Sequence, residues 1–179
     1  ISGSQNVKLL ISTGIGCVDS IIKTIIINAL PIPDGGPADS ICVFDTTQLG
    51  AAGGWADIAW GPNLGLSDTT ILNPDAFPLS TTNYIYYVTD VNGCIGTDTV
   101  EILVHGLPNP ILADLAEFCL GDSIQIVAGG GDTYVWSPVA GLSDPNTPNP
   151  YAQPTDTAQY FVTITDGNGC SNDDSIIVY

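Results

Sequence analysis

Asp166-Gly-Asn-Gly-Cys170 has a second copy earlier in the chain, Asp90-Val-Asn-Gly-Cys94, at an offset of 76 (170 − 94 = 76). Asn-Gly between two apolar runs is a strong signal for a tight β-hairpin, because both central residues of such a turn take positive φ. Alternating apolar residues precede the copies at 160–165 and 84–89, and a second apolar run follows each. Each copy therefore predicts a strand, a turn, a cysteine and a second strand.

The repeat extends well beyond this turn and keeps nearly the same offset. A fixed period of this length indicates tandem homologous domains. The landmarks that recur are Trp60 with Trp136, Asp68 with Asp144 and Asn73 with Asn149 at an offset of 76, and Cys42 with Cys119 and Asp45 with Asp122 at an offset of 77.

The first thirty residues fit the same series, since Cys17 precedes Cys94 by an offset of 77 (94 − 17 = 77). We therefore expect residues 1–30 to be the C-terminal hairpin of a partial domain. Two complete domains are expected to follow, at 31–106 and 107–179.

The partial domain leaves apolar side chains without a cover, because Val7, Leu9 and Ile11 would share one face of the hairpin. An isolated two-stranded hairpin is marginal in water, and exposed edges pair readily with other strands. Either upstream sequence or strands from a neighbouring subunit would complete this domain. We favour upstream sequence, because Cys17 needs a partner.

The predicted fold class is all-β, in tandem immunoglobulin-like β-sandwiches. The segment 141–150 carries three prolines and cannot be a helix, and the strands before the two turns alternate with a period of two. Trp60 and Trp136 are expected in the cores, as tryptophans on middle strands of sandwiches usually are. The other predicted core residues are Tyr84, Tyr86, Val88, Tyr160, Val162 and Ile164.

The charge excludes two classes of partner. Nineteen acidic residues against two basic ones give a net charge of −17, which repels nucleic acid and anionic membrane surfaces. Apolar runs also fall short of the roughly 20 residues that a membrane span needs. We expect neither nucleic-acid binding nor membrane insertion.

The five cysteines sort by repeat, with one early and one late cysteine in each full domain. This arrangement predicts the disulfides Cys42–Cys94 and Cys119–Cys170, with Cys17 paired outside this segment. Paired cysteines favour an oxidising, extracellular setting. No Cys-x-x-Cys occurs and there is a single histidine, so a zinc site is not expected.

Aspartates are the remaining candidates for a site, and we expect them to cap turns through backbone hydrogen bonds. Calcium is a weaker alternative, since it needs about 6–8 oxygen ligands and the chain has no Asp-x-Asp-x-Asp-Gly loop. No cofactor is expected. Catalysis is also not expected, because His105 lies at the end of a strand and no base lies beside a serine or threonine. The weak calcium candidates are Asp45, Asp68, Asp90, Asp122, Asp144 and Asp166.

Four segments resemble the PKD-like, immunoglobulin-like repeats of large Bacteroidota surface proteins: Cys119-Leu-Gly-Asp-Ser123, Tyr134-Val-Trp-Ser-Pro138, Gly141-Leu-Ser-Asp144 and Tyr160 to Cys170. The match covers nearly all of 107–179 and most of 40–104. It is looser in the first full domain, where Asp45 lacks the preceding glycine and Trp55 is added.

The resemblance implies a seven-stranded sandwich and an extracellular, cell-surface role without catalysis. Such repeats are typical of gliding-motility adhesins exported by type IX secretion. Our first hypothesis is a disulfide-stapled stalk in a large surface protein or filament, whose partners are neighbouring repeats of the same chain or identical subunits.

Two alternatives remain open. The chain could be a glycan-binding module that grips surface glycans around Trp55 or Trp136, or an accessory region of a secreted hydrolase. An aromatic ring exposed at a loop end would favour the glycan hypothesis, and a buried ring the stalk.

Overall fold

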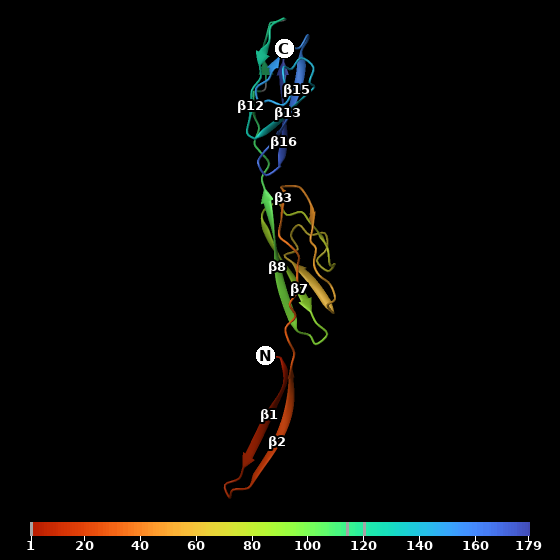
Figure 1. The fold of residues 1–179 in the computed structure, drawn as a ribbon, viewed down its shortest axis with the longest axis vertical. Coiled ribbons are helices and arrows are strands. Elements are labelled where there is room, and N and C mark those ends of the chain that lie inside the picture. The colour runs from red at the N-terminus through yellow and green to blue at the C-terminus, as the bar shows by residue number, and fades with distance from the viewer. Residues whose placement is uncertain (1, 114, 120) are drawn as a thin grey trace. The chain divides into compact units, whose positions relative to one another are not determined.

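The computed structural model describes residues 2–113, 115–119 and 121–179 (Figure 1). Within these ranges every regular element is a strand, and no helix is long and apolar enough to cross a membrane. Leu120, part of the Cys119–Ser123 segment singled out above, lies outside the described residues. The chain divides into two compact units. Unit 1 consists of Ile1–Asp39, Thr46–Pro78 and Thr82–Ile102, and unit 2 of Ser40–Asp45, Leu79–Thr81 and Leu103–Tyr179.

In chain order the strands are β1 (Gly3–Ser12), β2 (Val18–Ile27), β3 (Asp39–Cys42), β4 (Thr47–Gln48), β5 (Asp57–Gly61), β6 (Asp75–Ala76), β7 (Thr82–Thr89), β8 (Ile95–His105), β9 (Ile111–Leu112), β10 (Leu115–Ala116), β11 (Ile124–Gln125), β12 (Ala128–Gly129), β13 (Thr133–Ser137), β14 (Tyr151–Ala152), β15 (Ala158–Thr165) and β16 (Ser171–Val178).

Strands β1 and β2 form the hairpin predicted for the first thirty residues, in a register that places Leu9 opposite Ile21. Its side chains are exposed along both strands. Val7, Leu9 and Ile11 are 52–58% exposed, whereas their repeat counterparts Tyr84, Tyr86 and Val88 on β7 are at most 1% exposed. The face that forms the core in the complete repeats is thus bare in this hairpin.

The first complete repeat is built on a four-stranded sheet with the order β3-β8-β7-β5, and β4 pairs with β6. Alternation along β7 points Tyr84, Tyr86 and Val88 inward. Trp60 on β5 is 3% exposed, and its ring centroid lies 4.7 Å from that of Tyr86. The core predicted from the period-two pattern is confirmed here.

The second repeat has the equivalent sheet, in the order β10-β16-β15-β13, faced by the pairs β11-β14 and β12-β9. Tyr160, Val162 and Ile164 on β15 are fully buried, as predicted. Trp136 on β13 is 1% exposed and donates its indole N–H to the Thr147 carbonyl at 2.9 Å. Both tryptophans therefore belong to their cores.

The strands facing this sheet are shorter and more divided than a seven-stranded sandwich would have. Pro148 and Pro150 accept hydrogen bonds from the amides of Ala128 and Ile126, at 2.8 and 3.0 Å. Proline has no amide to return, so the ladder on this side ends after two residues. The first strand is also split: β9 pairs with β12, whereas β10 pairs in parallel with β16.

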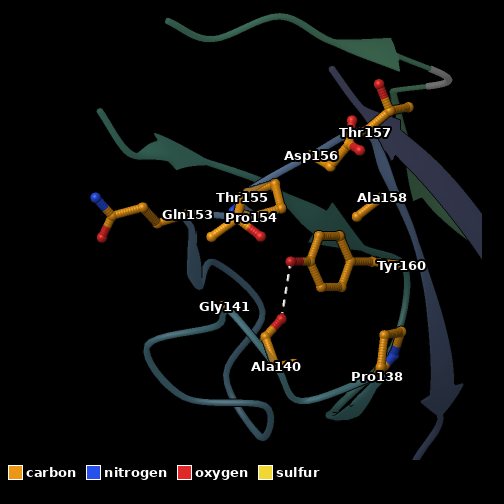
Figure 2. Close-up of a pocket in the computed structure, with 10 residues that line it drawn as sticks. All are labelled: Pro138, Ala140, Gly141, Gln153, Pro154, Thr155, Asp156, Thr157, Ala158 and Tyr160. Atoms are coloured by element: carbon orange, nitrogen blue, oxygen red, sulfur yellow. Dashed lines mark hydrogen bonds between the residues drawn. The ribbon is translucent and has the colours of Figure 1, made fainter. Parts of the chain in front are cut away.

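A buried tyrosine fixes the crossover segment in each repeat. Tyr84 Oη donates to the Leu64 carbonyl at 2.8 Å, and Tyr160 Oη donates to the Ala140 carbonyl at 2.9 Å, as Figure 2 shows. Burial raises the pKa of both phenols, so they stay protonated donors over a wide pH range. The tyrosine and its acceptor are separated by the same distance along the sequence in both repeats.

Tyr160→Phe is expected to lower the free energy of unfolding by about 0.5–1.5 kcal/mol, because the Ala140 carbonyl loses its donor while the ring still fills the core. Chemical denaturation of the oxidised chain measures this loss. Tyr151→Phe is the control, since Tyr151 is 52% exposed and should change stability little. Equal losses in the two variants would contradict the assignment.

Candidate functional site

One disulfide joins the two sequence repeats: Cys42, at the end of β3, is bonded to Cys170 with a Cα–Cα distance of 5.6 Å. Both cysteines lie in unit 2. Among the described residues Cys17, Cys94 and Cys119 are free thiols. The predicted pairs Cys42–Cys94 and Cys119–Cys170 are therefore wrong, while the involvement of Cys42 and Cys170 in a disulfide is correct.

Strand length explains why pairing inside one repeat fails. Phe118, next to Cys119, donates its amide to the Tyr179 carbonyl at the far end of β16, whereas Cys170 precedes the start of β16. Nine residues of extended strand separate the two ends by about 30 Å (179 − 170). A disulfide needs Cα atoms within about 7 Å. The early and late cysteines of one repeat thus lie at opposite ends of the same strand.

The late cysteine of each repeat lies in a turn closed by the side chain four residues earlier. Asp166 Oδ1 accepts the amides of Asn168 and Cys170 at 2.9 and 3.0 Å. Asp90 Oδ1 accepts those of Asn92 and Cys94, both at 2.8 Å. In the hairpin, Thr13 Oγ1 accepts the Cys17 amide at 3.2 Å. In all three turns, the side chain four residues before the cysteine accepts a hydrogen bond from the cysteine amide.

These hydrogen bonds set the pKa values of the two turn aspartates. The amide of Cys94 is the largest influence on Asp90 and lowers its pKa. Desolvation raises the pKa of Asp166, but the amides of Cys170 and Asn168 and the positive charge of His105 together outweigh it, so the net shift is downward. Both carboxylates are thus anionic acceptors well into the acidic range.

Stability is expected to fall on acidification as these carboxylates are protonated. A folded-state pKa below the unfolded value of about 3.9 stabilises the fold above that value, and the gain is lost as pH falls through the folded pKa. Asp166→Asn keeps a side-chain oxygen but removes the charge. Its stability deficit against the parent chain should shrink between pH 5 and pH 2, followed by urea unfolding at each pH. A deficit that stays constant over this range would contradict the assignment.

The remaining recurrent aspartates lie in turns of their own. Asp68 Oδ1 accepts the Thr70 amide at 2.7 Å, and Asp144 Oδ1 accepts the Asn146 amide at 2.9 Å. Through their backbone amides, Asp45 and Asp122 close turns onto the carbonyls of the early cysteines, at 3.0 and 2.9 Å. Across the described ranges no three His, Cys, Asp or Glu side chains are grouped so as to hold a metal ion. The structure does not bring the weak calcium candidates together.

Trp55 and Trp136, the two aromatic residues considered for glycan binding, differ in how deeply they are buried. Trp136 is buried in the core, so its ring offers no stacking platform. Trp55 is half-buried, and its indole nitrogen is buried without a hydrogen-bond acceptor among the described residues. By the criterion set out above, the burial of Trp136 favours the stalk.

Three adjoining hollows mark the end of the second repeat that carries Cys119. One, shown in Figure 2, has a volume of about 380 Å³ and includes Tyr160, Gly141 and Gln153 in its lining. Another, of about 430 Å³, surrounds Cys119. A third, of about 350 Å³, is lined by Gly141 and Gln153 of the first hollow and by Ser123 of the second.

We refer to this surface, formed by residues 117–119, 121–124, 141–143 and 153–158, as the Cys119 face. Gln153, which lines the first hollow, donates its Nε2 to the Gly121 carbonyl at 2.9 Å, and Asp122, next to Gly121, lines the second hollow. The amino-acid composition does not predict this surface. The sequence repeat does point to it, because Cys119 occupies the repeat position of Cys42, which is bonded.

Comparison with known proteins identifies the fold. No family model matches the sequence, and no curated protein matches it either. Among solved structures, the N-terminal eight immunoglobulin domains of Down syndrome cell adhesion molecule match with 11% identity and a TM-score of 0.51, over 97% of this chain and 35% of that one.

Two further neighbours are more distant in structure. The insect immune protein hemolin matches with 12% identity and a TM-score of 0.44, over 96% of this chain and 55% of that one. A Ca²⁺-stabilised, ice-binding adhesin from an Antarctic bacterium matches with 12% identity and a TM-score of 0.35, over 99% and 57%. The protein is therefore an all-β chain of the immunoglobulin-like fold.

Proposed function

We propose that this chain is a structural segment of an extracellular surface protein, a disulfide-stapled stalk that spaces or supports an adhesive part. The observation that carries the proposal is the Cys42–Cys170 bond, which ties one sequence repeat covalently to the next. A covalent tie across 128 positions is useful where a chain is pulled or exposed to proteases. Its formation fits an oxidising compartment outside the cytosol.

The sequence adds a source for such a segment. The segments at 134–138 and 160–170, which resemble PKD-like repeats, support a place in a large surface protein of the gliding-motility adhesin type. The net charge of −17 keeps such a surface solvated and discourages self-association. The adhesion-type neighbours support the same general role.

Labelling of intact cells tests this proposal. Antibodies raised against residues 31–179 are expected to bind unpermeabilised source cells, and non-reducing peptide mapping of the native protein should recover the Cys42–Cys170 pair. Labelling that appears only after permeabilisation, or both cysteines recovered as thiols, would overturn an extracellular stalk.

We also propose that the recurring aspartates act as turn caps and that the chain builds no tight calcium site by itself. A chelator is then expected to shift the melting temperature by less than about 5 °C, on the order of 1 kcal/mol for a domain of this size. Differential scanning calorimetry with EDTA and with added CaCl2 measures the shift. A larger, calcium-reversible decrease would identify these aspartates as ligands.

A further inference from the structure

The Cys42–Cys170 bond defines a register for all five cysteines. It joins the early cysteine of one repeat to the late cysteine of the repeat that follows. Cys119 is the early cysteine of the second repeat, and it is exposed and unbonded. If the register is a property of the repeat, Cys119 is the attachment point for a late cysteine in a further repeat.

The surroundings of Cys119 already have the geometry found at the bonded site. The Asp45 amide donates to the Cys42 carbonyl at 3.0 Å, and the Asp122 amide donates to the Cys119 carbonyl at 2.9 Å. Each cysteine also has a neighbour hydrogen-bonded to the end of the last strand of its repeat, although not the same neighbour. Val43, which follows Cys42, donates to the His105 carbonyl at 2.8 Å, and Phe118, which precedes Cys119, donates to the Tyr179 carbonyl at 3.0 Å. The turn that carries Cys119 is therefore formed before any partner binds.

The repeat equivalence also allows the Cys119 face to be compared with its counterpart in the first repeat. Ser40–Asp45 and Leu79–Thr81 come from the sequence of the first repeat, yet both belong to the compact body of unit 2. Their counterparts in the second repeat are residues 117–122 (offset 77) and 155–157 (offset 76). Of these counterparts, residues 117–119 and 122 line the hollow around Cys119, and residues 155–157 line the hollow of Figure 2. Around the cysteine itself, Ile41 is buried and Cys42 half-buried in the first repeat, whereas their counterparts Phe118 and Cys119 are half-buried and exposed.

Burial of the turn cysteines follows their bonding. Cys170 is fully buried and bonded, whereas Cys94 is half-buried and Cys17 exposed, both as free thiols. All three lie in turns closed by the same side-chain-to-amide hydrogen bond. The turn is the same in each case, and what distinguishes Cys170 is the early cysteine to which it is bonded.

We propose that the Cys119 face binds a following repeat of this same type, through that repeat's late-cysteine turn, and that Cys119 forms a disulfide with its cysteine. The same register assigns Cys94 and Cys17 to the early cysteines of preceding repeats. This inference rests on the proposed role as a tandem-repeat segment and names the partner.

Bond formation needs an oxidant, for which a glutathione disulfide suffices. The turn cysteine of the incoming repeat first exchanges with oxidised glutathione, releasing one glutathione thiol and leaving a mixed disulfide. The Cys119 thiolate then attacks the sulfur of the turn cysteine, and the second glutathione leaves as a thiol. Two protein thiols are oxidised and one glutathione disulfide is reduced to two thiols.

A chain lengthened by one repeat tests the proposal. A copy of residues 104–179 is appended after Tyr179, because Tyr179 occupies the repeat position of Leu103 (179 − 103 = 76). After refolding in a glutathione redox buffer, non-reducing peptide mapping should find Cys119 bonded to the cysteine copied from Cys170. Cys42–Cys170 should persist, and the copied Cys119 should be alkylated as a free thiol.

The Cys119→Ser variant of the lengthened chain separates docking from the bond itself. Amide hydrogen exchange at 121–124 and 155–157 is expected to slow when the copied repeat is present, even without the sulfur, relative to the original chain carrying the same substitution.

Three other results would contradict the proposal, and each identifies the part that is wrong. A free Cys119 beside an intact Cys42–Cys170 bond, with unchanged exchange, would overturn the docking proposal and leave the stalk in place. Loss of Cys42–Cys170 itself would overturn both. Disulfide-linked dimers through Cys119 would overturn docking of a following repeat in favour of contact between copies.

Discussion

A molecule of the oxidised chain pulled from its two ends is expected to extend only through residues 1–42 and 170–179. The disulfide carries the force directly from Cys42 to Cys170, and the segment between them (43–169) lies off the force path. Reducing the bond should release about 450 Å of further extension, at about 3.5 Å per residue over the 128 positions it spans. Single-molecule force spectroscopy with and without a reductant measures this difference.

Two cysteine variants sharpen this measurement. Cys42→Ser should show the full extension without any reductant, whereas Cys94→Ser should behave as the parent chain. If Cys42 were instead bonded to Cys94, Cys94→Ser would also show the full extension without a reductant. The oxidised parent chain would then shield only residues 43–93. An oxidised parent chain that releases its whole length would contradict the connectivity.

The shielding has a consequence for the proposed stalk. Most residues of both four-stranded sheets lie inside the closed loop and carry no tension directly. Strands β3 and β16 lie outside the loop, so force on the ends acts on these two strands first. With a following repeat bonded to Cys119, its loop would overlap the Cys42–Cys170 loop. Every position between Cys119 and Cys170 would then lie within two closed loops. A chain built this way resists extension through covalent bonds and not through the strength of its cores.

Local pattern was enough to predict the cores, because burial in a sandwich follows the period of two along each strand. Tyr84, Tyr86 and Val88 needed only that alternation. The position of the hairpin turns needed only Asn-Gly and the aspartate before it, but the expected turn type is wrong. Gly93 and Gly169 take positive φ, at 80° and 84°, whereas the asparagines before them do not. These features depend on residues within a few positions of each other, where sequence directly constrains conformation.

The disulfide could not be predicted in the same way, because it depends on which end of a strand each cysteine occupies. Sorting the cysteines by repeat treats each domain as closed and pairs Cys119 with Cys170, although the length of β16 separates them. The length of that strand can be read from the sequence, but not the position of Cys119 at its far end, which follows from the hydrogen bond between Phe118 and Tyr179. The hollows of the Cys119 face were also out of reach, since they arise where three loops distant in sequence meet.

Cys42→Ser is expected to lower the free energy of complete unfolding by about 5 kcal/mol, measured by guanidinium denaturation of the oxidised chain. A bond that closes 128 positions removes more conformational entropy from the unfolded chain than a short one, and the chain-entropy model gives about 5 kcal/mol for a loop of this length. Cys42 is the better position to change, because Cys170 is fully buried and its replacement would add a packing cost.

Cys94→Ser and Cys119→Ser are the matched controls. Both cysteines are unbonded, Cys119 is exposed and Cys94 is half-buried, so each substitution should change stability by less than about 1 kcal/mol. Pairing of Cys42 with Cys94 would instead make Cys94→Ser cost roughly 4 kcal/mol, the value for a sequence separation of 52 (94 − 42 = 52). The two connectivities therefore agree on Cys42 and differ at Cys94 by much more than the error of the measurement. A large loss in Cys94→Ser would show that the chain in solution closes within its first repeat.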